Sequence, residues 1–250
     1  MHLPSETIWP VYRKFKWFIP YVTMPPLTPR LGWYSPGITL PHEPGPLPFR
    51  PFHMVQHVAN NFTLKHWFEA QGFTVTERSF YLREAPFVVE NLWESLSSMS
   101  KRQIKKADAQ LRIQPEKDAS VLHDMMLKSL RRHRIRQCIA FERLQEMVLA
   151  ALQHESGCIW TAREASGRPH AAAFMLWDDK TLYFVGGGLD ESIKQIGASR
   201  LLLWKGIELA AQTGKAFEFG GGTDPGVGAV YDSMGGRQKI YYVALRSLFR

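Results

Sequence analysis

The sequence has few of the features that mark secreted, disulfide-linked or membrane-spanning proteins. Only 2 cysteines occur among its 250 residues, and they form neither a CxxC pair nor a disulfide framework. No apolar run approaches the roughly 18 residues that a transmembrane helix needs. The basic and then apolar segment at residues 13–19 is cut short by prolines and lacks a small-residue cleavage site, so we predict no signal peptide. A reducing compartment fits best, and we expect a cytoplasmic protein without a membrane span.

Signals for metal binding and for cysteine chemistry are also scarce. His53 and His57 are four residues apart, but their segment has the pattern of a strand and contains no HExxH motif. Cys138 and Cys158 have no nearby motif for nucleophilic catalysis. We therefore predict no metal site and no cysteine nucleophile.

Positive charge, by contrast, is abundant. Lys and Arg number 31 against 23 Asp and Glu, a net charge of +8. This charge favours anionic partners such as nucleotides, coenzyme A or tRNA, although a merely basic protein would have the same composition. Basic residues concentrate at 101–106 and at 131–136. Either run could contact the phosphates of tRNA or of a nucleotide-linked acceptor, and either could instead be a solvated helix face.

The first 110 residues or so alternate between extended and helical patterns. Capping-box spacing predicts that Asn91 and Ser100 begin two helices, because Glu94 and Gln103 follow them by three residues. Trp17, Trp33 and Tyr34 are expected to serve core and loop packing. Strands are predicted at 7–11, 16–22, 52–60 and 73–82, a proline-rich loop at 32–51, and a helix at 64–71 that ends at Gly72.

From Leu111 onwards the pattern becomes regular. Strands are predicted at 111–114, 158–164, 170–177, 181–185, 215–219 and 239–245. Helices are predicted from Asp118 to about Arg134, from Phe141 to near Gly157, at 198–213 and at 229–234, with a glycine-rich loop at 220–228. The order β-α-α-β-β-β-α-β-α-β predicts an α/β (α+β) fold with a mixed sheet flanked by helices.

The stretch between residues 181 and 219 combines a strand, a glycine break, a small-residue turn and a helix. Such a turn leaves the first N–H groups of the helix without backbone partners, at the positive end of the helix dipole, where a phosphate binds favourably. Gly186 and Gly187 would let a ligand approach the strand end, unless they form a simple bulge. A glycine turn into a buried helix is the alternative for the whole stretch. The residues predicted to hold the pyrophosphate of an acyl carrier such as coenzyme A are Lys194, Gln195, Gly197, Ala198, Ser199 and Arg200.

Two residues near the C-terminus are candidates for proton transfer. Acyl transfer from a thioester leaves a thiolate, which the hydroxyl of Tyr231 could protonate, unless Tyr231 is a core tyrosine held by one hydrogen bond. Glu218 lies between two phenylalanines on a short predicted strand, so it faces away from both. It could act as the base for an incoming amine, or it could pair with a neighbouring Lys or Arg.

These motifs resemble those of a known family. The element order, the turn at 194–199 and the Tyr-Asp-Ser-Met-Gly-Gly segment at 231–236 resemble GNAT-type acyltransferases. The phosphate loop of that family has the pattern Gln/Arg-x-x-Gly-x-Gly/Ala. Lys194, Gly197 and Ser199 stand at its first, fourth and sixth positions, so the first and sixth depart mildly from the pattern.

A second set of motifs is similar to the FemAB-like branch of this family, which carries two GNAT domains in tandem. These motifs lie at residues 91–93, 100–107, 197–204 and 217–221. The resemblance implies three segments. Residues 1–98 form a partial GNAT-like domain that lacks its front strand and helices, 99–114 a connecting basic helix, and 115–250 a complete acyltransferase domain.

The resemblance also implies an activity. An acyl group, most simply acetyl, would pass from acyl-CoA to an amine by direct attack, with Tyr231 as the acid, Glu218 as a candidate base and no metal. The FemAB-like alternative uses an aminoacyl-tRNA as donor and a peptidoglycan precursor as acceptor. A catalytically silent binding module is a third possibility.

Overall fold

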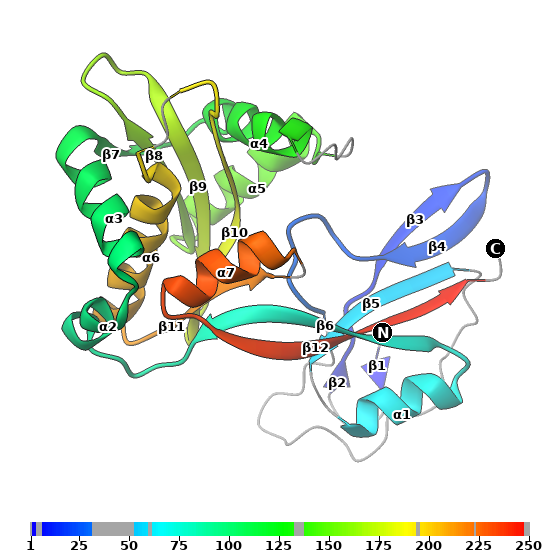
Figure 1. Cartoon of the computed structure of the whole chain (residues 1–250). Coiled ribbons are helices and arrows are strands. Elements are labelled where there is room, and N and C mark those ends of the chain that lie inside the picture. The colour runs from blue at the N-terminus through cyan, green and yellow to red at the C-terminus, as the bar shows by residue number, and fades with distance from the viewer. Residues whose placement is uncertain are drawn as a thin grey trace. The chain divides into compact units, whose positions relative to one another are not determined.

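The computed structural model describes residues 2–3, 7–31, 53–59, 62–132, 138–193, 196–222 and 224–247 (Figure 1). The chain forms two compact units. Unit 1 comprises Met1–Phe80 and Lys239–Arg250, and unit 2 comprises Tyr81–Gln238. These two units are defined by contacts between residues. The expected segments 1–98, 99–114 and 115–250 are instead defined by resemblance to a family with two GNAT domains in tandem, so the two divisions are not equivalent. That tandem division stays a prediction.

Unit 1 is built on a small sheet covered by one helix. The strands β3, β4, β5 and β12 lie side by side in that order, with β3–β4 and β5–β12 antiparallel and β4–β5 parallel. Its core contains Trp9, Met54 and Phe68, which are almost fully buried. The elements with residues in unit 1 are β1 (His2–Leu3), β2 (Thr7–Ile8), β3 (Tyr12–Lys16), β4 (Ile19–Thr23), β5 (His53–Ala59), α1 (Phe62–Ala70), β6 (Thr74–Arg83) and β12 (Arg237–Ser247).

The strand predicted at 16–22 is wrong, because the chain reverses in the middle of it. Trp17 and Phe18 form the two-residue turn of the β3–β4 hairpin, with φ of 51° and 66°. Two-residue hairpin turns usually contain Asn or Gly, so nothing local marks this one. Trp17 is 83% exposed and serves no packing. Trp33 and Tyr34 lie outside the described residues.

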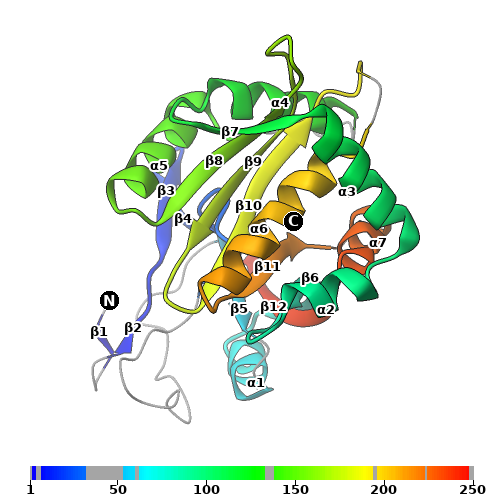
Figure 2. The same cartoon turned by 90° about the vertical axis from the view of Figure 1, so that its left-hand side faces the viewer.

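Unit 2 is a mixed sheet with helices on both faces (Figure 2). The strands β7 to β10 pair antiparallel with their neighbours in sequence, and β11 pairs parallel with β10. The helix α6 covers one face of these strands, while α4 and α5 cover the other. The elements are α2 (Val89–Ser95), α3 (Ser98–Gln110), β7 (Arg112–Glu116), α4 (Ser120–Arg132), α5 (Phe141–Gln153), β8 (Gly157–Arg163), β9 (Pro169–Trp177), β10 (Thr181–Leu189), α6 (Ala198–Gln212), β11 (Ala216–Gly221) and α7 (Pro225–Ser233). This confirms the predicted α/β order from Leu111 onwards.

The strand β9 is buried on both faces, which explains its nearly continuous apolar sequence. Ala173 and Met175 pack in one core cluster with Leu202 and Ile207 of α6. The helix comes close to the sheet at Gly206, where an added Cβ would lie 2.7 Å from the ring of Phe217. Alternation along the strands therefore sorts the side chains between two apolar layers.

Both predicted helix caps in unit 2 are wrong. α2 begins at Val89, before Asn91, and Val88 is its N-cap. α3 is capped by Ser97, whose hydroxyl accepts from the N–H of Ser100 at 3.1 Å. Ser100 has the better capping pattern by sequence, because Gln103 follows it by three residues, but Ser100 is fully buried inside the helix and Ser97 provides the cap. No helix in the described part of the chain is long and apolar enough to span a membrane.

Candidate active site

The central feature of unit 2 is the early parting of two neighbouring strands. The ladder between β10 and β11 contains only the pairs Thr181–Ala216, Leu182–Phe217 and Tyr183–Glu218. Both strands continue, β10 to Leu189 and β11 to Gly221. The register of β10 against β9 shifts between Phe184 and Gly186, as a β-bulge does, and bulges bend a strand away from its partner. Beyond Tyr183, the edge of β10 that faces β11 therefore forms no ladder of hydrogen bonds with it.

A cavity of about 430 Å³ lies at this opening. Its wall is mostly apolar, with a few hydroxyl and carboxyl groups from three helices and one strand end. The lining residues are Ser129, Ala172, Ala173, Phe184, Gly187, Gly188, Leu189, Glu191, Ser199, Leu202, Leu203, Asp224, Gly226, Val227, Val230 and Tyr231. A mostly apolar pocket with a few polar groups is typical of small-molecule sites.

The glycines of β10 are part of the strand and do not end it. The ladder with β9 continues from Gly186, opposite Phe174, to Leu189. The predicted break after Val185 is therefore wrong. An added Cβ at Gly187 would lie 2.6 Å from the carbonyl oxygen of Ala172, so glycine is required by close packing. Gly187 lines the cavity and Gly186 does not, and their role in ligand approach stays a prediction.

The N-terminus of α6 borders the same cavity through Ser199. Gly197 is the N-cap, with φ of 97°, a left-handed conformation that favours glycine. The first backbone bond of the helix runs from the N–H of Leu201 to the carbonyl of Gly197. The N–H groups at the start of a helix have no partner within the helix itself, so those that precede Leu201 can bind an anion. Ala198 is buried, and Lys194 and Gln195 lie outside the described residues.

Arg200 is turned towards α3. Its Nη1 donates to Oε1 of Gln103 at 2.8 Å, and burial lowers the pKa of the guanidinium. Nε of Arg200 is buried without a hydrogen-bond partner among the described residues. Arg200 does not line the cavity, so a direct contact with a bound phosphate stays a prediction. Its packing against α3 involved a residue 97 positions away, which no local pattern reveals.

Tyr231 of α7 lies in the wall of the cavity. It is 8% exposed, and its ring packs against Phe219 with centroids 5.3 Å apart and against Tyr81 at 5.9 Å. Burial raises the pKa of its hydroxyl to about 12, so Tyr231 is protonated throughout the neutral range. A protonated hydroxyl can donate a proton to a leaving thiolate. With a pKa of about 12, however, Tyr231 is a weaker acid than an ordinary thiol, whose pKa is about 8.5, so burial by itself does not favour this transfer.

The helix that carries Tyr231 begins earlier than predicted. α7 starts at Pro225, inside the predicted loop at 220–228, because Oδ1 of Asp224 accepts from the N–H groups of Gly226 and Val227 at 2.8 and 3.1 Å. Asp followed by Pro is a common helix start, and that signal could have located α7 and the cavity residues on it.

Glu218 is almost fully buried, with 1% of its surface exposed. It lies on β11 between Phe217 and Phe219, which belong to the core cluster under α6. Strand alternation turns it to the opposite face, that of α4 and α5. Glu218 does not line the cavity. Its role as a base therefore stays a prediction.

An ion pair fixes the far end of β10. Asp190, 7% exposed, accepts from Nζ of Lys128 on α4 at 2.8 Å and from the N–H of Ser192 at 3.0 Å. The bond from Lys128, followed by those from Ser192, lowers the pKa of Asp190 to about 2. The pair between Lys128 and Asp190 holds α4 to the end of the strand that borders the cavity. Lys128 also pairs with Asp124 of its own helix at 2.9 Å.

Replacing Asp190 with asparagine is expected to lower the free energy of unfolding at pH 7 by about 1–3 kcal/mol, because a charged hydrogen bond to Lys128 is lost. The folded pKa of Asp190 lies below its unfolded value, so the stabilisation is complete above about pH 4. It disappears as the pH falls towards about 2, and the two proteins then converge. Urea denaturation at pH 7 and at pH 3 measures this. Asp179→Asn, on an exposed turn, is the control, and equal loss in both variants would contradict the assignment.

Within the described residues no group of three or more His, Cys, Asp or Glu side chains is placed to hold a metal ion. Most of the basic run at 131–136 lies outside those residues.

Comparison with known families decides the class. The family model described as "Acetyltransferase (GNAT) domain" matches residues 96–225, more than half of the 250-residue chain. The chain belongs to the GNAT family. This confirms the resemblance inferred from the turn at 194–199 and the segment at 231–236. The protein is therefore an acyltransferase, of a family that generally uses acyl-CoA as co-substrate. A search of curated proteins found no match.

Solved structures confirm the GNAT-type fold. FemX is 10% identical with a TM-score of 0.60, over 77% of this chain and 72% of that one. The C-terminal domain of a putative lysylphosphatidylglycerol synthetase from Agrobacterium fabrum is 12% identical with a TM-score of 0.54, over 77% and 67%. A tandem GNAT protein from the clavulanic acid biosynthesis pathway is 10% identical with a TM-score of 0.51, over 78% and 63%. At such identities the likeness concerns the fold alone.

Proposed function

We propose that this GNAT protein transfers an acyl group, most simply acetyl, from acyl-CoA to an amine of its acceptor by direct attack. The observation that supports the proposal is the cavity where β10 and β11 part. The unpaired edge of β10, the N-terminus of α6 and Tyr231 all border it.

The donor would lie along the edge of β10. Amide groups of a pantetheine arm can pair with free backbone groups of a strand, as an added strand does. The pyrophosphate would then reach the N–H groups at the start of α6, between Gly197 and Ser199, where the helix dipole favours an anion. In this proposal Lys194 and Gln195, which precede the helix in sequence, are further phosphate ligands. Arg200 stabilises the turn through its hydrogen bond to Gln103.

The reaction needs one proton acceptor and one proton donor. The amine nitrogen attacks the thioester carbonyl carbon, the C–S bond breaks, and the thiolate takes the proton of the Tyr231 hydroxyl. The attacking amine loses a proton to a base or to solvent, and solvent restores the proton of Tyr231. Because Glu218 does not line the cavity, its proposed role as base requires a bridging water.

Acetyl-CoA at about 100 times its Kd is expected to raise Tm by roughly 5–10 °C, because that excess adds about 2.7 kcal/mol to the stability of a chain of this size. Ser199→Glu should abolish the shift by placing a negative charge in the phosphate site. A carboxylate at a helix N-terminus preserves the helix, so this variant should stay folded. Differential scanning fluorimetry measures both results.

Ser98→Glu is the matched control, since it makes the same change at the exposed first residue of α3. It should leave the shift intact. No shift with acetyl-CoA at millimolar concentration would count against the donor that we propose. If the protein binds neither acyl-CoA nor charged tRNA, the result favours the silent binding module.

The aminoacyl-tRNA alternative has less support in unit 2. On α3, Nζ of Lys101 donates to the carbonyl oxygen of Glu94 at 2.8 Å, and Lys105 lies over the ring of Trp93. Two of the four basic side chains in the run at 101–106 are thus already engaged. Salt-sensitive binding of charged tRNA, with no effect of CoA, would nevertheless establish that donor.

A further inference from the structure

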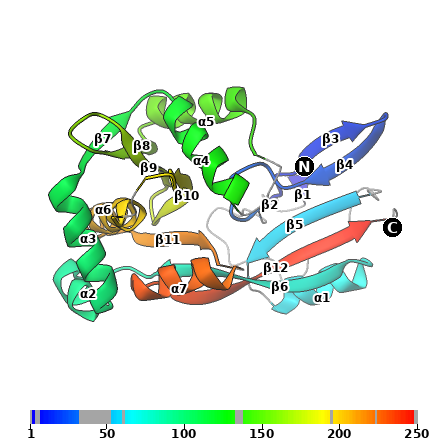
Figure 3. The same ribbon diagram turned by 45° about the horizontal axis from the view of Figure 1, so that its top comes forward.

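The β3–β4 hairpin of unit 1 ends in large apolar side chains that contact little else. Phe15 is 64%, Trp17 83% and Phe18 98% exposed. The neighbouring Ile19 is 37% exposed. Figures 1 and 3 show the two strands as a blue arm with this turn at its end. A cluster of exposed apolar side chains of this kind marks a surface that binds a protein, a membrane or a ligand.

The turn geometry singles out the same two aromatics. Trp17 and Phe18 both have positive φ, as the central residues of a type I′ turn do. Asn and Gly adopt this conformation readily, whereas bulky side chains are rare in it. The sequence therefore keeps two aromatic rings at a position where they oppose formation of the turn. An unfavourable local choice of this kind is expected where the side chains themselves have a use.

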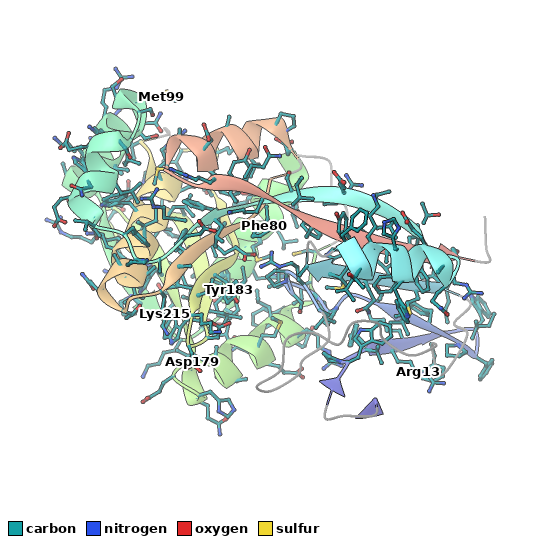
Figure 4. The ribbon with its side chains drawn as sticks, turned by 90° about the horizontal axis from the view of Figure 1, so that it is seen from below. Arg13, Phe80, Met99, Asp179, Tyr183 and Lys215 are labelled. Atoms are coloured by element: carbon teal, nitrogen blue, oxygen red, sulfur yellow. The ribbon has the colours of Figure 1, made fainter. Side chains whose placement is uncertain are left out.

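Basic side chains surround the base of the aromatic tip. Arg13, Lys14 and Lys16 lie on β3, and residues 12–23 contain no Asp or Glu. Alternation puts Lys14 and Lys16 on one face of the hairpin and Arg13 on the other. Arg13, labelled in Figure 4, has its guanidinium 4.8 Å from the centre of the Phe15 ring, so its charge lies beside exposed apolar surface.

We propose that this hairpin docks the protein onto an anionic phospholipid membrane surface. Trp17 and Phe18 enter the boundary between headgroups and acyl chains, where aromatic residues are most stable. Arg13, Lys14 and Lys16 then lie at the depth of the lipid phosphates, which attract cations on the cytoplasmic leaflet. The apolar tip thus matches the boundary of the acyl chains, and the basic residues around it match the layer of lipid phosphates.

The same residues suit RNA less well. Proteins that bind single strands space their aromatic platforms along a basic groove, so that successive bases stack. Here the aromatics meet at one turn, next to the aliphatic Ile19, which offers no stacking face. The proposal rests on unit 1 alone and does not depend on the acyl donor or acceptor.

Co-sedimentation with vesicles tests the proposal. The wild-type protein should sediment with vesicles of phosphatidylcholine and phosphatidylglycerol in equal parts, and not with phosphatidylcholine alone. Raising the salt concentration should weaken binding. Trp17→Asn with Phe18→Gly, a pair that favours the turn, should reduce the partition coefficient at least about tenfold. Replacing Arg13, Lys14 and Lys16 with glutamine should reduce it roughly 100-fold.

Two matched controls remove equivalent groups elsewhere. Val88→Asn with Leu149→Asn removes two exposed apolar side chains, which are 56% and 53% exposed. Glutamine at Arg102, Lys106 and Lys117 removes three exposed charges. Both controls should bind vesicles as the wild type does.

Three results would overturn the proposal. The first is failure of vesicle binding to depend on the hairpin. Either the wild-type protein does not sediment with phosphatidylglycerol vesicles, or the tip variant sediments with them as the wild type does. The second is salt-sensitive binding of bulk tRNA that the glutamine variant at residues 13, 14 and 16 loses, without vesicle binding. The third is self-association that the tip variant abolishes, again without vesicle binding, which would make the hairpin a contact between copies. Sedimentation velocity detects the last.

Discussion

Tyr231→Phe is expected to lower kcat by roughly 100- to 10,000-fold, the range that a general acid contributes. The KM for acyl-CoA should change little, because the phenyl ring keeps its contacts with Phe219 and Tyr81. Only the proton that the leaving thiolate needs is removed. Initial rates with acetyl-CoA and an amine acceptor, read from release of the free thiol, measure the effect.

Tyr183→Phe is the control for this experiment. Burial, followed by a hydrogen bond to Asp178, raises the pKa of Tyr183 to about 12, as burial does for Tyr231. Its hydroxyl, however, donates to Oδ2 of Asp178 at 2.8 Å, at the opposite end of β10, near Asp179 and Lys215 (Figure 4). Activity should therefore persist in this variant. Equal rates for Tyr231→Phe and the wild type would eliminate the acid role.

Gly188→Ala is expected to destabilise the protein by about 3 kcal/mol, at the upper end of the usual cost of overpacking. An added Cβ would overlap the carbonyl group of Met125 and lie 2.6 Å from the N–H nitrogen of Met126. Both contacts are with the backbone of α4, which cannot rotate away as a side chain can. The strand or the helix must shift, and the cavity that both line must change with it.

Chemical denaturation and the acetyl-CoA thermal shift together measure this effect. Gly221→Ala, at the end of β11, is the control, because a Cβ there meets nothing within 4 Å. That variant should retain both its stability and its shift. A Gly188→Ala protein as stable as the control would contradict the close packing of β10 against α4.

The sequence was sufficient for the order of elements in unit 2. Its helices show apolar residues such as Leu122, Leu144 and Val148 at helical spacing, and these are fully buried. Gly72 and Gly214 adopt the left-handed conformation expected at the ends of their helices. Such signals are local, because each depends on residues within one or two turns of the chain.

The errors arose where distant contacts decide the local structure. β10 continues through Gly186 and Gly187 because β9 keeps pairing with it, although glycine weakens a strand by itself. Trp17 and Phe18 form a turn that neither residue favours. Propensity describes the isolated segment, and tertiary packing overrides it at these sites.

The brief ladder between β10 and β11 has a mechanical consequence. A sheet resists separation of its strands through the ladder, and here only three pairs join the two halves. The resistance then depends on what covers the seam, which is α6. At Gly206 this helix approaches both Met175 of β9 and Phe217 of β11, so it packs on strands from both sides of the opening. The sheet is thus held together by packing under α6 where the ladder stops, and the backbone edges of β10 and β11 stay open for binding.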